Sequence, residues 1–336
     1  MRIDAYTHFI PGRIFEKLES SGKGDIVKRM RGVPSIYDLD IRRKIVDKYD
    51  DYAQILSYPM PPLEILTQGA ALDEYAKLIN DGFVEICEKY RDQFPGWVAQ
   101  VSMAAPDTGI REAKRALAAG ALGVQIYTNV SGRPLDDPAF ADFFAEMEKT
   151  GKPIWMHPVR AANSPDYLAE KKSRFEIWWA LGWSYETAAA MARLVFSGIM
   201  DRHPKLKIIT HHFGGIAPML EGRLGYGWDQ LGARTSDEDL GVVLRSLKKR
   251  PLDYFKHSFY ADTAVFGGAP ATKCGFDFFD LDKILFASDC PFDPEKGTLY
   301  IRETLRILDE LNLPKADRAR IDYRNLEAIT GVKFVK

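Results

Sequence analysis

Short apolar runs alternate with longer helical patterns along almost the whole of this 336-residue chain. The runs predict eight strands, at residues 2–6, 52–57, 96–101, 123–126, 153–157, 206–210, 258–262 and 283–288. The segments between and after them predict helices at residues 71–94, 108–119, 138–150, 184–203, 267–279, 297–311 and 315–330. Eight strands separated by helices favour one α/β domain, residues 1–336, folded as a (β/α)8 TIM barrel, over a two-domain doubly wound sheet.

Two segments fall outside this alternation. Residues 12–45 are too many for a plain loop after the first strand, and we expect them to form a small insertion across the barrel mouth. Residues 160–183 follow the fifth strand and are rich in aromatic and charged side chains. Long loops after barrel strands carry function more often than stability. The tryptophans of this loop predict either a wall for a substrate or a subunit interface.

Composition excludes several classes of protein. A net charge of −1 gives no broad basic surface for nucleic acid, and neither a G-x-G-x-x-G nor a Walker lysine motif supports nucleotide binding. No run of about 18 apolar residues predicts a membrane span. The three cysteines, Cys87, Cys274 and Cys290, are odd in number and lack C-x-x-C spacing, which favours a reducing compartment. We therefore expect a cytoplasmic protein.

Histidine and aspartate side chains follow several of the predicted strands. His8 follows the first strand, His157 ends the fifth, His211 and His212 follow the sixth, and Asp289 follows the eighth. The carboxyl ends of barrel strands meet at one cavity, so these distant positions are expected to become neighbours. Neutral imidazole and carboxylate are the usual ligands of a catalytic divalent ion such as zinc. The pattern predicts a metal site at the mouth.

Each of these residues taken alone could be structural, and some are expected to be. Alternation along the first strand places Tyr6 and His8 on one face. His211 is expected to point to the other side of its strand from His212 and to serve as a packing residue. His203 lies in a helix-to-strand turn, and His257 precedes a strand at the end of the barrel opposite the mouth. Both are interpreted as structural.

Several short motifs together resemble the amidohydrolase-related superfamily, on the branch of 2-amino-3-carboxymuconate-6-semialdehyde decarboxylase and related aromatic-acid decarboxylases. The opening D-x-H-x-H of that family corresponds to residues 4–8, where Tyr6 replaces the first histidine. The remaining motifs are Gly123-Val-Gln-Ile126, His157-Pro158, Pro204-Lys-Leu-Lys207 with His212-Phe-Gly-Gly215 and Pro218, Ser258-Phe-Tyr-Ala-Asp262, and Ser288-Asp289-Cys-Pro-Phe292.

The resemblance implies metal ligation by His8, His157 and Asp289, with zinc as the expected ion and manganese as an alternative. It implies that His212, rather than His211, is the catalytic imidazole, because the spacing from Pro204 matches His212. His212 or Asp289 would handle the proton that replaces carbon dioxide.

The same resemblance suggests residues that contact the substrate. Arg223 corresponds to an arginine that reaches the substrate carboxylate of a neighbouring subunit, which implies a homodimer or a higher homo-oligomer. Arg42, in the predicted insertion, is a second candidate for a carboxylate clamp, since a guanidinium can bind a carboxylate through two hydrogen bonds. Trp178, Trp179 and Phe292 are candidates for apolar walls.

Tyr6 is the departure from the family pattern. A neutral phenol, with an unperturbed pKa of about 10, is a poor ligand, although a divalent cation can convert it to phenolate. The ion could instead keep three protein ligands and water, which is a normal catalytic number. A third possibility is that metal binding is weak or lost.

We predict a metal-dependent, non-oxidative decarboxylase of a small aromatic or unsaturated carboxylic acid. The alternatives are a metal-dependent hydrolase of a lactone, ester or carbon–carbon bond, a hydratase, or a non-catalytic small-molecule binder whose metal site Tyr6 has weakened. The expected partner is a small carboxylic acid, with no nucleic acid and no membrane.

Overall fold

Parallel strands form at each of the predicted positions in the computed structural model, which describes residues 1–20 and 24–335. They are β1 (Arg2–His8), β2 (Tyr52–Ser57), β3 (Gly96–Trp97), β4 (Ala99–Gln100), β5 (Val124–Tyr127), β8 (Ile154–His157), β9 (Ile208–Thr210), β10 (Tyr260–Asp262) and β11 (Ile284–Leu285). The single predicted strand at residues 96–101 is split at Val98 into β3 and β4. A short antiparallel ribbon, β6 (Asn129–Val130) with β7 (Arg133–Pro134), lies in the loop after β5.

Each parallel strand pairs with the next one along the chain, except that β3 and β4, the two halves of one split strand, pair with β2 and β5 respectively. One sheet has the order β1-β2-β3, and the other has the order β11-β10-β9-β8-β5-β4. Beyond these sheets, the Ala5 amide donates to the Phe286 carbonyl at 2.8 Å and the His8 amide donates to the Cys290 carbonyl at 2.8 Å. The first strand is thus hydrogen-bonded to the segment that directly follows β11. This arrangement of parallel α/β sheets is consistent with the predicted TIM barrel.

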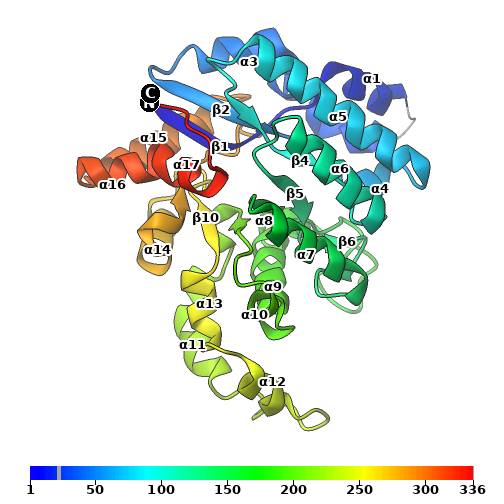
Figure 1. Cartoon of the computed structure of the whole chain (residues 1–336), viewed down its shortest axis with the longest axis vertical. Helices are drawn as coiled ribbons and strands as arrows, with labels where there is room; N and C mark the ends of the chain where they lie inside the picture. The colour runs from blue at the N-terminus through cyan, green and yellow to red at the C-terminus, as the bar shows by residue number, and fades with distance from the viewer. Residues whose placement is uncertain (21–23, 336) are drawn as a thin grey trace.

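Helices between the strands and after the last one cover the outer face of the sheets (Figure 1). The principal ones are α5 (Ala70–Lys89), α6 (Pro106–Ala118), α7 (Ala141–Thr150), α9 (Gly182–Phe196), α13 (Pro251–His257), α14 (Ala269–Phe278), α15 (Leu299–Glu310), α16 (Lys315–Ala319) and α17 (Asn325–Thr330). The predicted helix at residues 184–203 is interrupted at Gly198, where φ is 75°, and continues as α10 (Ile199–Arg202). In α5, Leu72, Ala76, Ile79 and Phe83 are buried at helical spacing, which explains how that helix packs.

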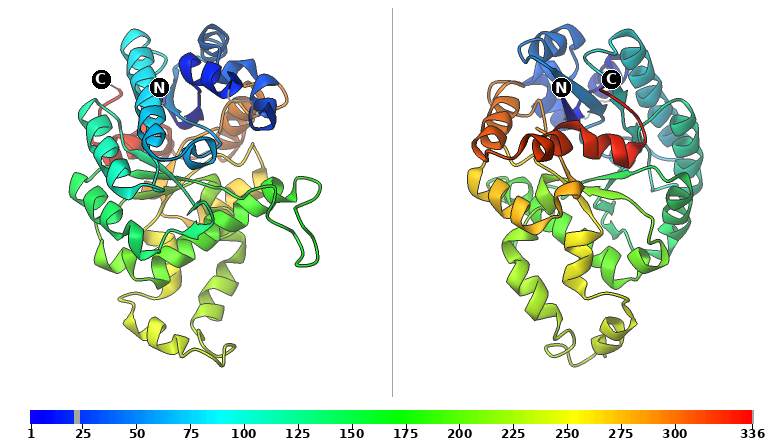
Figure 2. Two further views of the ribbon diagram at one scale, coloured as in Figure 1. Left: turned by 90° about the vertical axis from the view of Figure 1, so that its right-hand side faces the viewer. Right: turned by 60° about the vertical axis from the view of Figure 1, so that its left-hand side comes forward.

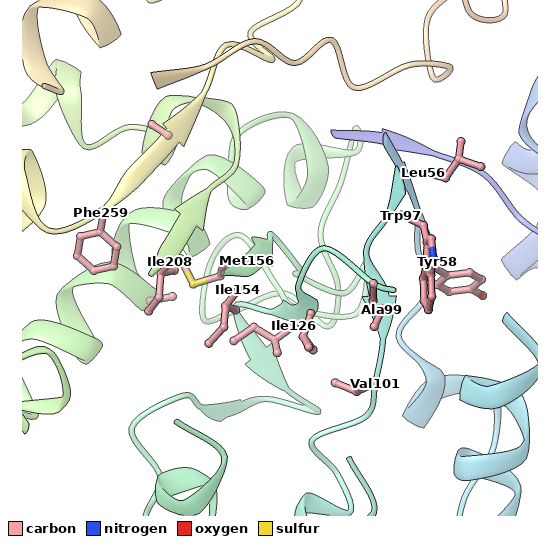
Figure 3. Packing of buried hydrophobic residues seen from close by; sticks show 14 of the residues in the cluster. Leu56, Tyr58, Trp97, Ala99, Val101, Ile126, Ile154, Met156, Ile208 and Phe259 are labelled. Atoms are coloured by element: carbon pink, nitrogen blue, oxygen red, sulfur yellow. The ribbon is translucent and has the colours of Figure 1, made fainter. Parts of the chain in front are cut away.

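Side chains of the strands alternate between two apolar clusters. Ile154, Met156 and Ile208 belong to the cluster shared with the helices, which Figure 3 shows from close by. Trp155 and Ile209 belong instead to an inner cluster. This period of two is the expected consequence of strand geometry, and it directs the residues at strand ends alternately inward and outward.

Residues 12–46 contain α1 (Gly12–Ser20), α2 (Gly24–Arg31), the 3-10 turn at Pro34–Ile36 and α3 (Leu39–Val46). Residues 21–23 of the predicted insertion lie outside the described part of the chain. The segment packs beside the carboxyl end of β1, since the Ile10 amide donates to the Ile36 carbonyl at 2.7 Å. Its definition as an insertion stays a prediction.

Two parts of the chain extend from the body of the molecule. The loop after β8, which includes the short helix α8 (Ile177–Ala180), projects to one side in the left view of Figure 2. Helices α11 (Glu221–Trp228) and α12 (Leu240–Ser246) form a lobe at the lower end of Figure 1. Within the described residues, no helix has the length and apolar character needed to cross a membrane.

Candidate metal centre

Four side chains from distant parts of the chain meet at the carboxyl ends of the strands. His8 ends β1, His157 ends β8, His211 follows β9, and Asp289 follows β11. One ligand atom from each of the three histidines lies within 4.8 Å of the others. The Oδ1 atom of Asp289 lies 3.0 Å from Nε2 of His8 and 3.5 Å from Nε2 of His211. The structure therefore brings together His8, His157 and Asp289, whose role as ligands stays a prediction.

Hydrogen bonds fix the protonated nitrogen of His8 and His157. The Ser57 hydroxyl donates to the Thr7 carbonyl at 3.0 Å, so its oxygen accepts from Nδ1 of His8 at 2.9 Å. Nδ1 of His157 donates to the Pro158 carbonyl at 2.7 Å. Each Nε2 is then left with a lone pair, as a metal ligand requires. Burial lowers the pKa of both imidazoles, and neighbouring histidines lower that of His157 further, which favours their neutral forms.

His211 also faces the centre, so the prediction that it points away from the site is wrong. It is fully buried, and Nδ1 lies 2.6 Å from Oδ2 of Asp262. Nε2 faces Asp289. Burial alone would lower the pKa of His211, but the carboxylates of Asp262 and Asp289 outweigh burial and raise this pKa to about 9. Alternation explains the orientation, because His211 lies two residues beyond the inward-facing Ile209.

His212 reaches the same region because the backbone turns sharply after His211. Its φ is 55°, in the left-handed region, and its amide donates to Oδ1 of Asp262 at 3.0 Å. Nδ1 donates to the Ala264 carbonyl at 2.5 Å, which leaves Nε2 able to accept a proton. Burial, together with the neighbouring His211, lowers the pKa of His212 to about 4. The His211 and His212 rings stack with their centroids 3.6 Å apart.

Tyr6 lies beneath the histidines but directs its hydroxyl elsewhere. The hydroxyl donates to Oε1 of Gln125 at 2.8 Å, while the Gln125 amide nitrogen donates to the Tyr58 carbonyl at 2.7 Å. Burial first, and then Tyr127, Asp262 and Asp289, raise the pKa of Tyr6 well above its ordinary value. The phenol is therefore held as a neutral hydrogen-bond donor.

Asp289 has the charge that a cation site needs. Burial would raise its pKa, but His211 and His8 outweigh that effect and hold the pKa far below the ordinary range. The preceding residue, Ser288, is fixed by Asp4, whose Oδ1 accepts from the Ser288 amide at 3.0 Å and whose Oδ2 accepts from the Ser288 hydroxyl at 2.5 Å. Asp4 thus ties β1 to the loop that presents Asp289 and does not itself join the histidine cluster.

Aromatic rings surround the centre. The Trp183 ring lies edge-on to His157 at 5.4 Å between centroids, the Phe292 ring lies 5.8 Å from His8, and the Phe266 ring lies 5.3 Å from His212. Trp178 and Trp179 contact Trp183 rather than a histidine. Sequence reasoning named Trp178, Trp179 and Phe292, but not Trp183 or Phe266. Aromatic content of the loop signalled Trp183, whereas no motif pointed to Phe266.

The predicted carboxylate clamps have different surroundings. Arg42 is fully buried and donates to the carbonyl groups of Ser35 and His8, to Oε1 of Gln54 and to Sγ of Cys290. These bonds argue against a clamp and indicate that Arg42 supports the backbone beside His8. Arg223 is exposed on α11, and its action across a subunit interface stays a prediction.

Arg29 was not among the candidates and lies near the centre. It is exposed on α2 and donates to the Phe292 carbonyl at 2.5 Å. Its charge also acts on Tyr300, whose ring stacks on Phe266 with the centroids 4.2 Å apart. A lone arginine in a helical segment carries no sequence signal that would have distinguished it.

The donor set fits a divalent cation. With Nδ1 protonated, Nε2 of His8 presents a lone pair toward the Asp289 carboxylate 3.0 Å away, and a cation bound between the two acceptors would stabilise this arrangement. The Nε2 atoms of His8 and His211 are buried and have no hydrogen-bond partner anywhere in residues 1–20 and 24–335. Nitrogen and carboxylate oxygen together suit zinc and several other divalent transition metals. Such an ion could polarise a substrate oxygen and stabilise developing negative charge.

The amidohydrolase family model matches residues 3–328, so the chain belongs to the amidohydrolase family. Among its relatives, gamma-resorcylate decarboxylase of Rhodococcus jostii (strain RHA1) is 27% identical over 334 residues, covering 94% of this chain and 91% of that protein. The 2-amino-3-carboxymuconate-6-semialdehyde decarboxylase of Dictyostelium discoideum is 26% identical over 310 residues, covering 87% of this chain and 82% of that protein. These names bear out the predicted resemblance and support a carboxy-lyase.

A solved structure shows the same fold. The dihydroxybenzoic acid decarboxylase of Polaromonas sp. JS666, determined with bound manganese and the inhibitor 2-nitroresorcinol, superposes with a TM-score of 0.80. It is 22% identical in sequence, and the match covers 98% of this chain and 96% of that chain.

Proposed function

We propose that this protein is a divalent-metal-dependent, non-oxidative decarboxylase of a small aromatic carboxylic acid. The observation that carries the proposal is that His8, His157 and Asp289 lie close together, buried and surrounded by aromatic rings. Nε2 of His8 and Nε2 of His157 each present a lone pair there. The aromatic-acid decarboxylases to which the chain is similar support the same reaction.

His8, His157 and Asp289 would hold the ion in this proposal. When bound, the ion supplies a positive charge that binds a substrate oxygen and stabilises negative charge on the ring. Zinc is the first choice, and the manganese of the Polaromonas enzyme makes manganese the alternative to test.

Decarboxylation breaks the bond between the ring carbon and the carboxylate, leaves its electron pair on that carbon, and places a proton there as carbon dioxide departs. His212 is the candidate for handling this proton, since Nδ1 is held by Ala264 and Nε2 is available. Asp289 is the second candidate. Its pKa lies far below the ordinary range, so protonating it is costly, and the comparison favours His212.

The surrounding rings would hold the planar substrate and keep water away from it. Trp183, Phe266 and Phe292 each contact a histidine of the centre, so they can pack against a ring bound there. Arg29, at the edge of the same region, is a candidate partner for the substrate carboxylate. Trp178 and Trp179 would form an outer layer.

The remaining expectations belong to the same proposal. The hydrogen bonds between β1 and residues 286–290 support a closed (β/α)8 barrel as one domain, with residues 12–45 as the insertion and 160–183 as the active-site loop. The three free cysteines support a cytoplasmic location. Exposed Arg223 and the exposed side chains of Leu168 and Phe175 support a homodimer or higher oligomer.

The test uses purified protein that has been freed of metal and then loaded with zinc or manganese. It is assayed for carbon dioxide release from hydroxybenzoates, including 2,6-dihydroxybenzoate, and from muconate semialdehydes. In deuterated water the product should carry one deuteron at the carbon that lost its carboxylate. Hydrolysis of a lactone or ester with solvent oxygen entering the product, and no carbon dioxide from any acid, would reject the proposal.

A further inference from the structure

Compared with the family pattern, this chain lacks one histidine of the metal site, because position 6 is Tyr6. The motif has histidine at this position, but the Tyr6 hydroxyl donates its proton to Oε1 of Gln125. The Gln125 amide cannot rotate to offer a donor instead, because its nitrogen is bonded to the carbonyl of Tyr58 and to Oε1 of Gln100. Tyr6 therefore keeps its proton and uses its hydroxyl as a donor to Gln125.

A second imidazole occupies the space above the Tyr6 ring. The His211 ring meets the Tyr6 ring edge-on, with the centroids 4.5 Å apart. Its ligand atom lies within 4.8 Å of those of His8 and His157, and Nε2 lies 3.5 Å from the Asp289 carboxylate. The Tyr6 ring thus packs against the His211 ring, while Nε2 of His211 faces His8, His157 and Asp289.

Asp262 holds His211 in the orientation of a ligand. Its Oδ2 atom lies 2.6 Å from Nδ1, and both side chains are fully buried. A carboxylate bonded to the far nitrogen of a histidine commonly orients a metal ligand and raises its basicity. Nε2 has no hydrogen-bond partner within the described chain, and such buried unpartnered groups are rare in a purely structural role.

We propose that His211 is a metal ligand in this protein and replaces the histidine that the family pattern places at position 6. The inference rests on the proposed function only in requiring a divalent ion at this site. The ligands would then be the imidazoles of His8, His157 and His211 and the carboxylate of Asp289. The same two carboxylates that favour a proton on His211 also favour a cation there, so the ion would take the place of that proton. His212 would be left free of the ion, so the two adjacent histidines would have separate tasks.

This ligand set also predicts which ion the protein prefers. A site with three nitrogen donors and one oxygen donor suits zinc or cobalt(II), whereas manganese favours oxygen-rich sites. Zinc should therefore displace manganese when both are offered at equal concentration.

The main experiment compares His211→Gln with the matched neighbour His212→Gln and with Tyr6→Phe. Zinc affinity is measured by competition with a chelator, and the ligand environment by the visible spectrum of the cobalt(II) form. His211→Gln should weaken zinc binding by more than about 100-fold, since changing even an outer partner of a ligand costs roughly 10- to 100-fold. It should also change the cobalt spectrum. His212→Gln and Tyr6→Phe should keep the zinc affinity and the spectrum of the unmodified protein.

A rescue variant guards against loss of the fold. Tyr6→His combined with His211→Ala restores the histidine of the family pattern, and we expect it to bind zinc more tightly than His211→Ala alone. No recovery would overturn the claim of replacement. Unchanged affinity and spectrum in His211→Gln, or an equal loss of zinc in His212→Gln or Tyr6→Phe, would overturn the assignment of His211 as the ligand.

The unmodified protein separates this inference from the proposed function. If it binds zinc, releases no carbon dioxide and loses the ion through His211→Gln, the inference stands and the decarboxylase proposal fails. If it decarboxylates an acid while His211→Gln retains zinc, the inference alone fails.

Discussion

The six histidines of the chain lie at two ends of the strands, and their surroundings differ. His8, His157, His211 and His212 lie at the carboxyl ends, whereas His203 and His257 lie near the amino ends of β9 and β10. Both groups use Nδ1 in similar contacts. His203 lies 3.1 Å from a Glu148 carboxylate oxygen and His257 lies 2.8 Å from one of Asp280, just as His211 lies beside Asp262.

Burial and convergence distinguish the two groups. The His257 and Asp280 side chains are 48% and 40% exposed, whereas His211 and Asp262 are 0% exposed. At the amino ends, a hollow of about 590 Å³ is lined by Lys205, Lys207, Lys248, Lys249 and Lys283 and by only two carboxylates, Glu148 and Asp201. The excess of positive charge there disfavours a cation. A histidine–carboxylate pair therefore does not by itself indicate a site. Several buried imidazoles with free lone pairs, facing one another and a carboxylate, do so.

His157→Ala is the strongest way to break the comparison. The substitution removes one ligand nitrogen and leaves the backbone hydrogen bonds of the strand in place. The variant should therefore fold but bind much less than one equivalent of metal. Carbon dioxide release should fall by more than about 100-fold, the scale of losing one electrostatic contact in a transition state. Elemental analysis and circular dichroism measure the two effects. A normal metal content in this variant would place the site elsewhere.

His212→Gln tests whether, among the four histidines at the carboxyl ends, His212 transfers a proton rather than binding the ion. It should keep the ion but lower the decarboxylation rate by about 10²- to 10⁴-fold, the usual contribution of a positioned proton-transfer group. Steady-state kinetics on protein of verified metal content provides the measurement. A rate near that of the unmodified protein would shift the proton-handling role to Asp289.

Trp183→Ala tests the role of the aromatic rings that surround the histidines at the carboxyl ends of the strands. The indole contacts His157, and an aromatic contact of this kind contributes roughly 0.5–1.5 kcal/mol beyond its buried area. We expect kcat/KM for an aromatic acid to fall by up to about tenfold. The metal content should not change. Trp179→Ala is the matched control, because Trp179 lies behind Trp183 and should have a smaller effect on kcat/KM.

His257→Ala should have the smallest effect. The side chain pairs with Asp280 near the surface, and exposed pairs contribute about 0–1 kcal/mol to the free energy of unfolding. Metal content and decarboxylation should equal those of the unmodified protein. Loss of either would show that the two ends are coupled, and the contrast between them would no longer hold.

The positions of the strands and the convergence of most candidate site residues could be predicted because they depend on local pattern. Apolar runs located the parallel strands, and strand ends located His8, His157 and Asp289. The predicted helix at residues 184–203 ran past its interruption at Gly198, since helical periodicity does not register a single left-handed residue.

The orientation of His211 could not be obtained in this way. The prediction treated His211 and His212 as opposite faces of one extended segment and assigned the inner face to His212. Alternation from Ile209 instead directs His211 inward, and the left-handed turn at His212 brings the second ring to the same region. For Arg42, the sequence indicates a positive charge but not the hydrogen bonds that the guanidinium donates to the carbonyl groups of Ser35 and His8.

Asp262 has a consequence for any attempt to redesign this protein. Its Oδ2 atom fixes the His211 imidazole, while Oδ1 accepts from the backbone amides of His212 and Ala264. Ala264 in turn supplies the carbonyl that binds the His212 ring. Asp262 thus fixes the orientation of both His211 and His212, which have different proposed roles. Libraries that vary β10 would alter both tasks together, so selections for altered chemistry should hold Asp262 constant and diversify the aromatic rim.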